Sequence, residues 1–193
     1  MSTYEYGRIA KLAQCLEEAG LAPEVIGQIM AGGEAIRQSS SPAAKMGWLK
    51  TAMLRMDQLL DQETRRTVRE ACACCLGGNR LALAKSIAKR YATLEERLQA
   101  ANEAKFLFGH SVTQQEDGRI LVSFYPAGLA SYRCSCLPKA TETLPLTYCY
   151  CCGGHVKHHL QIALGHKLSC EVRSSALSSG GKEPCTFLLT LVA

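Results

Sequence analysis

Residues 132–159 read YRCSCLPKATETLPLTYCYCCGGHVKHH and hold the densest group of reactive side chains in the chain. This Cys-rich segment contains two Cys-x-Cys pairs with twelve residues between them, one further cysteine and three histidines: Cys134, Cys136, Cys149, Cys151, Cys152, His155, His158 and His159. Closure of the intervening loop could bring four thiols to one point, which is the arrangement of a thiolate metal site. We therefore expect the fold to be organised around this segment.

Length and cysteine usage restrict the class of protein. A chain of 193 residues buries about 70% of its unfolded surface, so its core does not depend on disulfides. The sequence has no secretory leader pattern and no apolar run of about 18 residues, so we expect a cytoplasmic protein with no membrane partner. In a reducing compartment, eleven cysteines favour metal ligands, catalytic thiols or redox groups over a disulfide framework.

The charge pattern argues against a nucleic-acid partner. The net charge is +5, and the basic residues are scattered among acidic ones along the predicted helices. A nucleic-acid binder usually has a basic stripe with interleaved aromatic residues, and the chain contains only twelve aromatic residues. A small-molecule ligand is the partner that fits better, and the sequence does not determine the oligomeric state.

Hydrophobic periodicity predicts helices in the first half of the chain and hairpins in the second. Helices are expected over residues 4–19, 23–31, 43–60, 61–75, 80–101, 139–144 and 154–164. Strand pairs are expected over 106–112 with 120–125, and over 167–177 with 185–192. Helices segregated before strands predict an α+β fold, in which the two hairpins form one antiparallel sheet. We expect a helical region, 1–103, and a Cys-rich α+β domain, 104–193, packed as one compact unit.

The two Cys-x-Cys pairs are the first candidates for metal ligands. Residues two apart in a strand point to the same face, so Cys134 and Cys136 could aim at one point, as could Cys149 and Cys151. Zinc takes four such ligands in a tetrahedron at about 2.3 Å. The expected site is therefore a zinc ion held by four thiolates.

The neighbouring residues leave alternatives open. Cys152 or His155 could replace one thiolate, and His155 with His159, at i and i+4, offers another ligand pair, with His158 beside them. Adjacent Cys151 and Cys152 are not expected to serve one metal easily, which keeps an iron–sulfur cluster or a redox-active thiol pair open. Reduced cysteines buried as small apolar residues are a further alternative.

A second group of thiols lies earlier in the chain, at Cys72, Cys74 and Cys75. These residues are expected in the last turn of a helix, followed by Gly77 and Gly78. They could complete the main site or form a second one. One of them could also act as a nucleophile, with its pKa lowered by the start of the next helix near Arg80.

The last part of the chain resembles a known family. Residues 151–191, CCGGHVKHHLQIALGHKLSCEVRSSALSSGGKEPCTFLLTL, look like the end of the vinyl-reductase-type small-molecule-binding domains. The resemblance implies zinc ligands at Cys149 or Cys151, at Glu171 and at Cys185. Ser174 stands where that family has a further cysteine, so Cys134 or Cys136 would have to supply the missing thiolate.

Two other likenesses accompany this one. The order CxC, CxC, Gly, helix and terminal Cys-x-Phe is similar to a group of uncharacterised, cysteine-rich bacterial proteins. The Gly turn followed by Cys-x-Phe is also similar to the end of thiazoline-carboxylate hydrolases, which implies an enzyme.

Three functional hypotheses follow. The first is a non-catalytic small-molecule-binding or sensory protein with a cysteine-ligated zinc site. The second is a cysteine- or metal-dependent hydrolase of a small molecule, which requires an open metal position or a thiol within reach of a histidine. The third is a free-thiol protein with a redox role. Whether the protein is an enzyme stays open at this stage.

Overall fold

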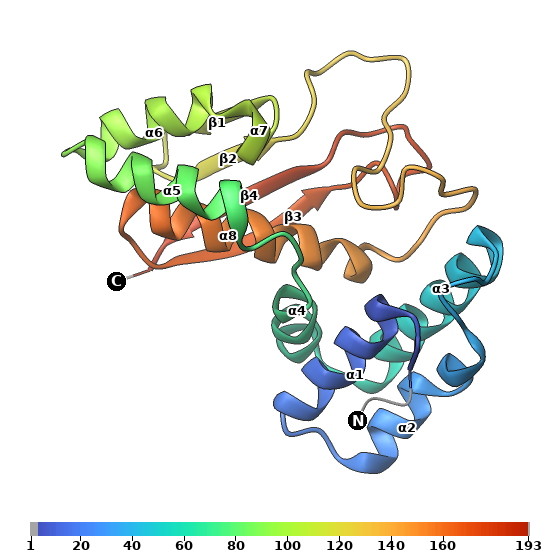
Figure 1. Cartoon of the computed structure of the whole chain (residues 1–193). Helices are drawn as coiled ribbons and strands as arrows, with labels where there is room; N and C mark the ends of the chain where they lie inside the picture. Colours follow the sequence, from blue (N-terminus) through green and yellow to red (C-terminus); the bar gives the residue numbers. More distant parts are fainter. Residues whose placement is uncertain (1–3, 193) are drawn as a thin grey trace.

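The computed structural model describes residues 4–192, and its elements follow the order expected for an α+β chain (Figure 1). The helices are α1 (Gly7–Glu18), α2 (Pro23–Met30), α3 (Pro42–Leu59), α4 (Gln62–Ala71), α5 (Gly78–Arg90), α6 (Leu94–Glu103), α7 (Lys105–Phe108) and α8 (Tyr150–Leu164), with 3-10 turns η1 (Gly33–Ala35) and η2 (Leu146–Cys149). The strands are β1 (Ser111–Gln114), β2 (Ile120–Ser123), β3 (Leu168–Ser174) and β4 (Thr186–Leu191).

The four strands form one sheet in the order β1-β2-β4-β3, and every neighbouring pair is antiparallel. The two hairpins are joined through β2 and β4, where Val122 lies opposite Phe187. The α+β class and the single antiparallel sheet built from two hairpins are therefore confirmed. In Figure 1, helices α1–α4 gather at one end of the molecule. At the other end, α6 and α8 lie against the sheet and α5 packs on α8.

Helix α8 is the element that joins these two parts. It packs against β3 and β4 on one side and against α4, α5 and α6 on the other. Its buried apolar side chains are Val156, Leu160, Ala163 and Leu164. They belong to the same core as Leu16 of α1 and Leu98 of α6, so helices on both sides of residue 103 share one hydrophobic core.

The predicted helix over 80–101 is in fact two helices. Helix α5 ends at Arg90, and α6 begins after Thr93, whose hydroxyl accepts a hydrogen bond from the backbone N–H of Glu96 at 3.2 Å. The Glu96 carboxylate accepts the N–H of Thr93 in return, at 3.0 Å. This reciprocal capping box provides the new start that periodicity alone does not reveal.

Four other local predictions were wrong. Residues 105–108 form α7, so β1 begins later than expected, and residues 139–144 form no helix. Cys149 lies in η2, and Cys151 lies in α8, so the second Cys-x-Cys pair is helical and not a strand. Helix α4 ends at Ala71, so the thiols that follow it lie on a loop.

Within residues 4–192, no helix combines the length and the apolar character that a membrane span needs.

Candidate metal centre

Three cysteine thiols meet at the start of α8. Cys151 and Cys152 lie in its first turn, and Cys136 comes from the loop 124–145 that leads back to it. All three sulfurs lie within 4.8 Å of one another, and the sulfurs of Cys136 and Cys152 are 3.1 Å apart. In a tetrahedral zinc site with bonds of about 2.3 Å, neighbouring sulfurs are about 3.8 Å apart. The three thiols are therefore placed to hold one ion after small side-chain adjustments.

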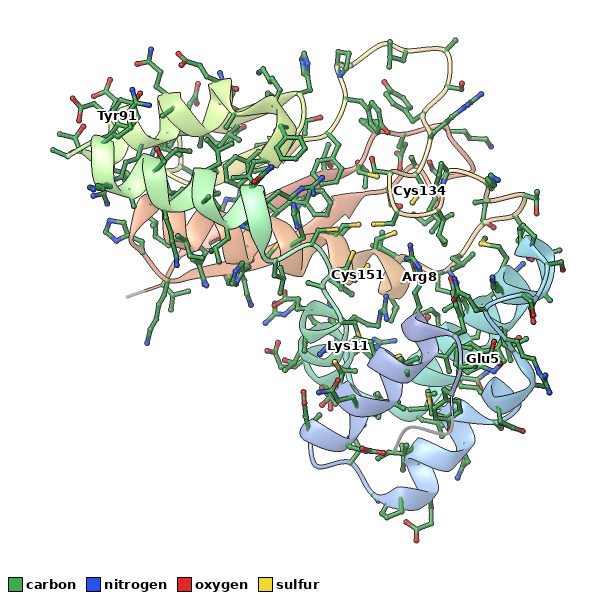
Figure 2. The ribbon with its side chains drawn as sticks, viewed as in Figure 1. Glu5, Arg8, Lys11, Tyr91, Cys134 and Cys151 are labelled. Carbon is green, nitrogen blue, oxygen red and sulfur yellow. The ribbon has the colours of Figure 1, made fainter. Side chains whose placement is uncertain are left out.

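Adjacent Cys151 and Cys152 thus approach the same partner, contrary to the expectation for neighbouring residues. In the helical turn their side chains lie about 100° apart around the axis, not on opposite faces as in a strand. Figure 2 shows sulfur atoms gathered around Cys151, between the start of α8 and the loop that carries Cys134. The helical start of residues 149–152 is what makes this three-thiol cluster.

Cys74 approaches the same cluster from the loop between α4 and α5. Its thiol and that of Cys136 form a hydrogen bond, which lowers the pKa of Cys74 to about 6. Cys75 follows with φ at +62°, a left-handed conformation that non-glycine residues rarely adopt, and its sulfur lies 3.8 Å from that of Cys74. We call Cys74, Cys136, Cys151 and Cys152 the thiol cluster.

Two histidines of α8 hold the loop that carries Cys74. Nε2 of His159 donates to the Cys75 carbonyl oxygen at 3.1 Å, and Nδ1 of His155 lies 3.3 Å from the carbonyl oxygen of Cys74. Burial lowers the pKa of His159 to about 4 and also lowers that of His155, so both rings are neutral at pH 7. The ring of His158 packs edge-on against His159. Within residues 4–192 no histidine joins the thiols in a three-ligand group.

Two arginines from distant helices bring positive charge to the cluster. Arg8 of α1 donates to the Cys136 carbonyl oxygen at 2.8 Å and to the Tyr148 hydroxyl at 2.6 Å. Arg69 of α4 is 4% exposed and donates to the Tyr148 carbonyl oxygen at 3.0 Å. Its Nε has no hydrogen-bond partner, and none of the ion pairs of the described chain involves Arg69.

These charges favour the ionised form of Cys151, but not of every thiol in the group. For Cys152, the hydrogen bond from Cys136 is outweighed by its contact with Cys151 and by burial, so its pKa is raised. Hydrogen bonds from Cys136 and Cys152 lower the pKa of Cys151 well below the ordinary value, and the guanidiniums of Arg69 and Arg8 lower it further against the effect of burial. The same contact with Cys151 raises the pKa of Cys136, which is the donor of the group. Cys74 and Cys151 are therefore the thiols of the cluster that favour the thiolate form, which is the form that binds metals.

Gly154 allows α4 to approach closely enough to deliver Arg69, and Gly153 beside it allows the sheet to approach α8. A Cβ atom added at Gly154 would lie 2.3 Å from the Glu70 carbonyl oxygen and 2.8 Å from its Cα. A Cβ at Gly153 would lie 3.3 Å from the sulfur of Cys170 on the sheet side. Lys157, one turn further along α8, forms an ion pair with Glu70. Gly154 thus sets the contact between α4 and α8 next to the cluster.

The other predicted site residues lie elsewhere. Cys149 is 2.8 Å from the buried hydroxyl of Ser175, Cys185 accepts the Ala176 N–H at 3.4 Å, and Cys134 accepts the Leu137 N–H at 3.4 Å. Burial raises the pKa of all three thiols, so they are neutral. These three cysteines remain predicted ligands that the structure does not bring into the thiol cluster.

The glutamate and the remaining cysteines are also separate. Glu171 is exposed on β3 and pairs with Arg173 at 3.2 Å. Cys72, at the end of α4, forms a hydrogen bond with Cys15 of α1, which lowers the pKa of Cys15 to about 7. Burial raises the pKa of Cys170 to about 12.

A cavity of about 290 Å³ opens directly above the thiol cluster. Its lining residues come from the loop after α4, from α5, α7 and α8, and from the loop 124–145: Cys74, Cys75, Arg80, Lys105, Phe106, Leu107, Gly109, Phe124, Tyr125, Ser135, Cys136, Cys151, Cys152 and His155. All four thiols of the cluster thus face a space in which a small molecule could lie beside them.

Sequence reasoning did not find the arginines of this site. Arg8 lies more than a hundred positions before the cysteines that it approaches, and nothing near it in the sequence marks it. Arg69 has a weak signal, because it follows Val68 on the buried face of an otherwise polar helix. Periodicity alone could have flagged it as a buried charge, but could not have named its partners.

The fold and the site together define an α+β protein with a cysteine cluster beside a small cavity. The chain belongs to a family of unknown function, DUF6144, whose model matches residues 18–191. No curated protein and no solved structure matches the chain.

Proposed function

We propose that the protein binds one divalent metal ion, zinc in the first place, through Cys136, Cys151 and Cys152, with Cys74 as the fourth ligand. The convergence of three sulfurs within 4.8 Å carries this proposal. Zinc prefers four thiolate or imidazole ligands in a tetrahedron and needs no other group from the chain. An iron–sulfur cluster also takes four thiolates, so it is the alternative for the same residues.

The charge balance supports four thiolates. A divalent ion with four thiolates carries a net charge of about −2, which the guanidiniums of Arg8 and Arg69 would neutralise. Without anionic sulfur, Arg69 would be a buried cation with only a carbonyl oxygen and an aromatic ring as partners. Burial of an unpaired charge is costly, so the anionic cluster explains why this arginine is tolerated.

The proposal extends to the cavity. A small molecule bound there would contact the thiolates, so the protein would act as a binding or sensory protein and not as a structural zinc module. It would work in a reducing compartment such as the cytoplasm, because all eleven cysteines are free thiols. A bacterial origin and a vinyl-reductase-type relationship of the last third belong to the same proposal and rest on the sequence resemblance alone.

The hydrolase alternative has less support. It needs an open metal position or a thiol beside a basic histidine. The proposed four-thiolate site leaves no open position, and both ring nitrogens of His155 and Nε2 of His159 contact backbone carbonyl oxygens. The redox alternative has one observation in its favour, because sulfurs 3.1 Å apart, as in Cys136 and Cys152, need little movement to form a disulfide of about 2.05 Å.

Elemental analysis of protein purified anaerobically tests the proposal. We expect one equivalent of zinc per chain, reduced to near zero in Cys136→Ser and Cys152→Ser. Cys134→Ser and Cys185→Ser are matched controls, since both thiols are buried and neutral but lie outside the cluster. Zinc that survives Cys136→Ser and is lost in Cys134→Ser would overturn the ligand set. Protein without metal, together with a Cys136–Cys152 disulfide after mild oxidation, would favour the redox alternative.

A further inference from the structure

The cavity above the thiol cluster has a charge pattern that the metal proposal does not use. Arg80 and Lys105 both line it, and no aspartate or glutamate is among its lining residues. The charges of Arg8 and Arg69 are directed at the sulfurs instead, and neither of these arginines lines the cavity. The cavity therefore has two positive charges of its own.

Neither charge is paired with a carboxylate within the described chain, although the thiols of the cluster line the same cavity. Arg80 takes part in none of the ion pairs of residues 4–192, and its guanidinium carbon lies 4.5 Å above the ring of Phe106. Lys105 donates one hydrogen bond to the His110 carbonyl oxygen, which leaves two of the three ammonium donors. A guanidinium and an ammonium at one cavity are suited to a carboxylate or another small oxyanion.

The start of α5 adds to this positive potential. Arg80 lies in its first turn, and the helix begins at Gly78 after the N-cap residue Gly77, with no side chain capping the free N–H groups. The N-terminus of a helix carries a partial positive charge of roughly half an elementary charge. Arg80 and the helix dipole thus act in the same direction.

The remaining wall of the cavity is apolar and aromatic. Phe106, Leu107, Phe124 and Tyr125 line it, and Phe106 is 61% exposed although it is a large aromatic side chain. A volume of 290 Å³ equals that of about ten water molecules at about 30 Å³ each, which suits a molecule with a single ring. Most ligand pockets combine such apolar walls with a few charged groups that fix orientation.

We propose that the cavity binds a small aromatic carboxylate, with its anionic group on Arg80 and Lys105 and its ring against Phe106, Phe124 and Tyr125. This inference rests on the proposed function for the identity of the cavity and names the chemical class of its ligand. Bound there, the molecule lies beside Cys74, the exposed thiol of the cluster. Occupancy of the cavity would therefore change the environment of the metal.

Binding of phenylacetate to the full-length protein as purified, followed by ligand-observed NMR and calorimetry, tests this inference. The neutral analogue 2-phenylacetamide has the same shape without the charge, and we expect it to bind at least about tenfold more weakly. Arg80→Gln and Lys105→Gln should each weaken phenylacetate binding by about tenfold. Lys85→Gln is the matched control, because Lys85 is exposed on the same helix and does not line the cavity.

The zinc content of each variant separates this inference from the proposed function. Normal zinc with phenylacetate and phenylacetamide binding equally, or with no phenylacetate binding, overturns the inference and leaves the metal proposal intact. Absence of zinc together with charge-dependent phenylacetate binding overturns the metal proposal and retains the anion site. Equal losses in Lys85→Gln and Arg80→Gln would show a general charge effect and would also overturn the inference.

Discussion

At Gly154, the backbone of Glu70 in α4 occupies the place that a side chain on α8 would need. Replacement of Gly154 by alanine is therefore the sharpest test of how α4 and α8 are placed. The added Cβ would lie 2.3 Å from the Glu70 carbonyl oxygen, where ordinary contacts begin at 3.4 Å. Backbone cannot rotate away as a side chain can. The distance between α4 and α8 must therefore increase by about 1 Å at this contact.

The expected cost follows from two opposing effects. Alanine in a helix interior is favoured over glycine by about 1 kcal/mol. Overpacking of a close contact costs about 1–3 kcal/mol, and a clash with backbone lies at the upper end of that range. We expect Gly154→Ala to lower the free energy of unfolding by about 2 kcal/mol. The shift of α4 should also move Arg69 away from the thiols and weaken zinc binding.

Urea unfolding with Gly47→Ala as the control isolates the clash. Gly47 lies inside α3, and a Cβ there would have no atom within 4 Å, so this variant carries the helix-propensity gain alone. We expect it to be more stable than the parent by up to about 1 kcal/mol. If Gly154→Ala proved as stable as Gly47→Ala, with unchanged zinc content, the close α4–α8 contact inferred here would be refuted.

Three further outcomes can be checked on the same protein. Arg69→Met should weaken zinc binding by about tenfold, because one neutralising charge is lost. Chelator competition measures this change. Arg173→Met, on the exposed face of β3, is the control and should leave zinc binding unchanged. Burial keeps the pKa of His159 at about 4, below its ordinary value of about 6.5. The free energy of unfolding should therefore have its full value above pH 6.5 and fall as the pH drops toward 4. His159→Gln should flatten this part of the pH profile relative to the parent. Removal of zinc by a chelator under reducing conditions should lower the unfolding temperature. The difference should grow with the zinc concentration of the loaded sample. An unchanged unfolding temperature would contradict the proposal that a bound ion stabilises the fold.

The sequence was sufficient for the fold class because helices and hairpins have different periods. Apolar spacing predicted α1, α2, α3 and most of α4, and the short apolar runs that contain β2 and β4 predicted the sheet. The misplaced boundaries depend on groups that periodicity does not measure. The capping box at Thr93 splits one long apolar pattern into α5 and α6, and Phe106 to Phe108, apolar enough for a strand, form a helical turn.

The candidate site was predictable in its residue types but not in its geometry. Cys136, Cys151 and Cys152 were among the candidates because of their spacing, and the structure brings them together. The reason given for their convergence was wrong, however, because it required Cys149 and Cys151 to lie in a strand, whereas they lie in η2 and α8. Cys74 could be named only as one of several thiols. Its place in the cluster depends on a loop held by His155 and His159, which are 81 and 84 positions away from the carbonyls they contact.

The convergence of separate segments explains why an ion, and not a disulfide, suits this site. Cys136 and Cys152 alone could be joined by one covalent bond, but that bond would leave Cys74 and Cys151 without a partner and would remove negative charge from beside Arg8 and Arg69. A metal ion would tie the loop after α4, the loop 124–145 and the start of α8 at one point, while keeping the charge that the two arginines require. Since Arg8 belongs to α1 and Arg69 to α4, the proposed ion would also fix the N-terminal helices on the sheet-bearing part. Loss of the ion should therefore loosen the contact between these two parts before either part unfolds. Hydrogen exchange should show this order, with faster exchange first in α4 and in the first turn of α8.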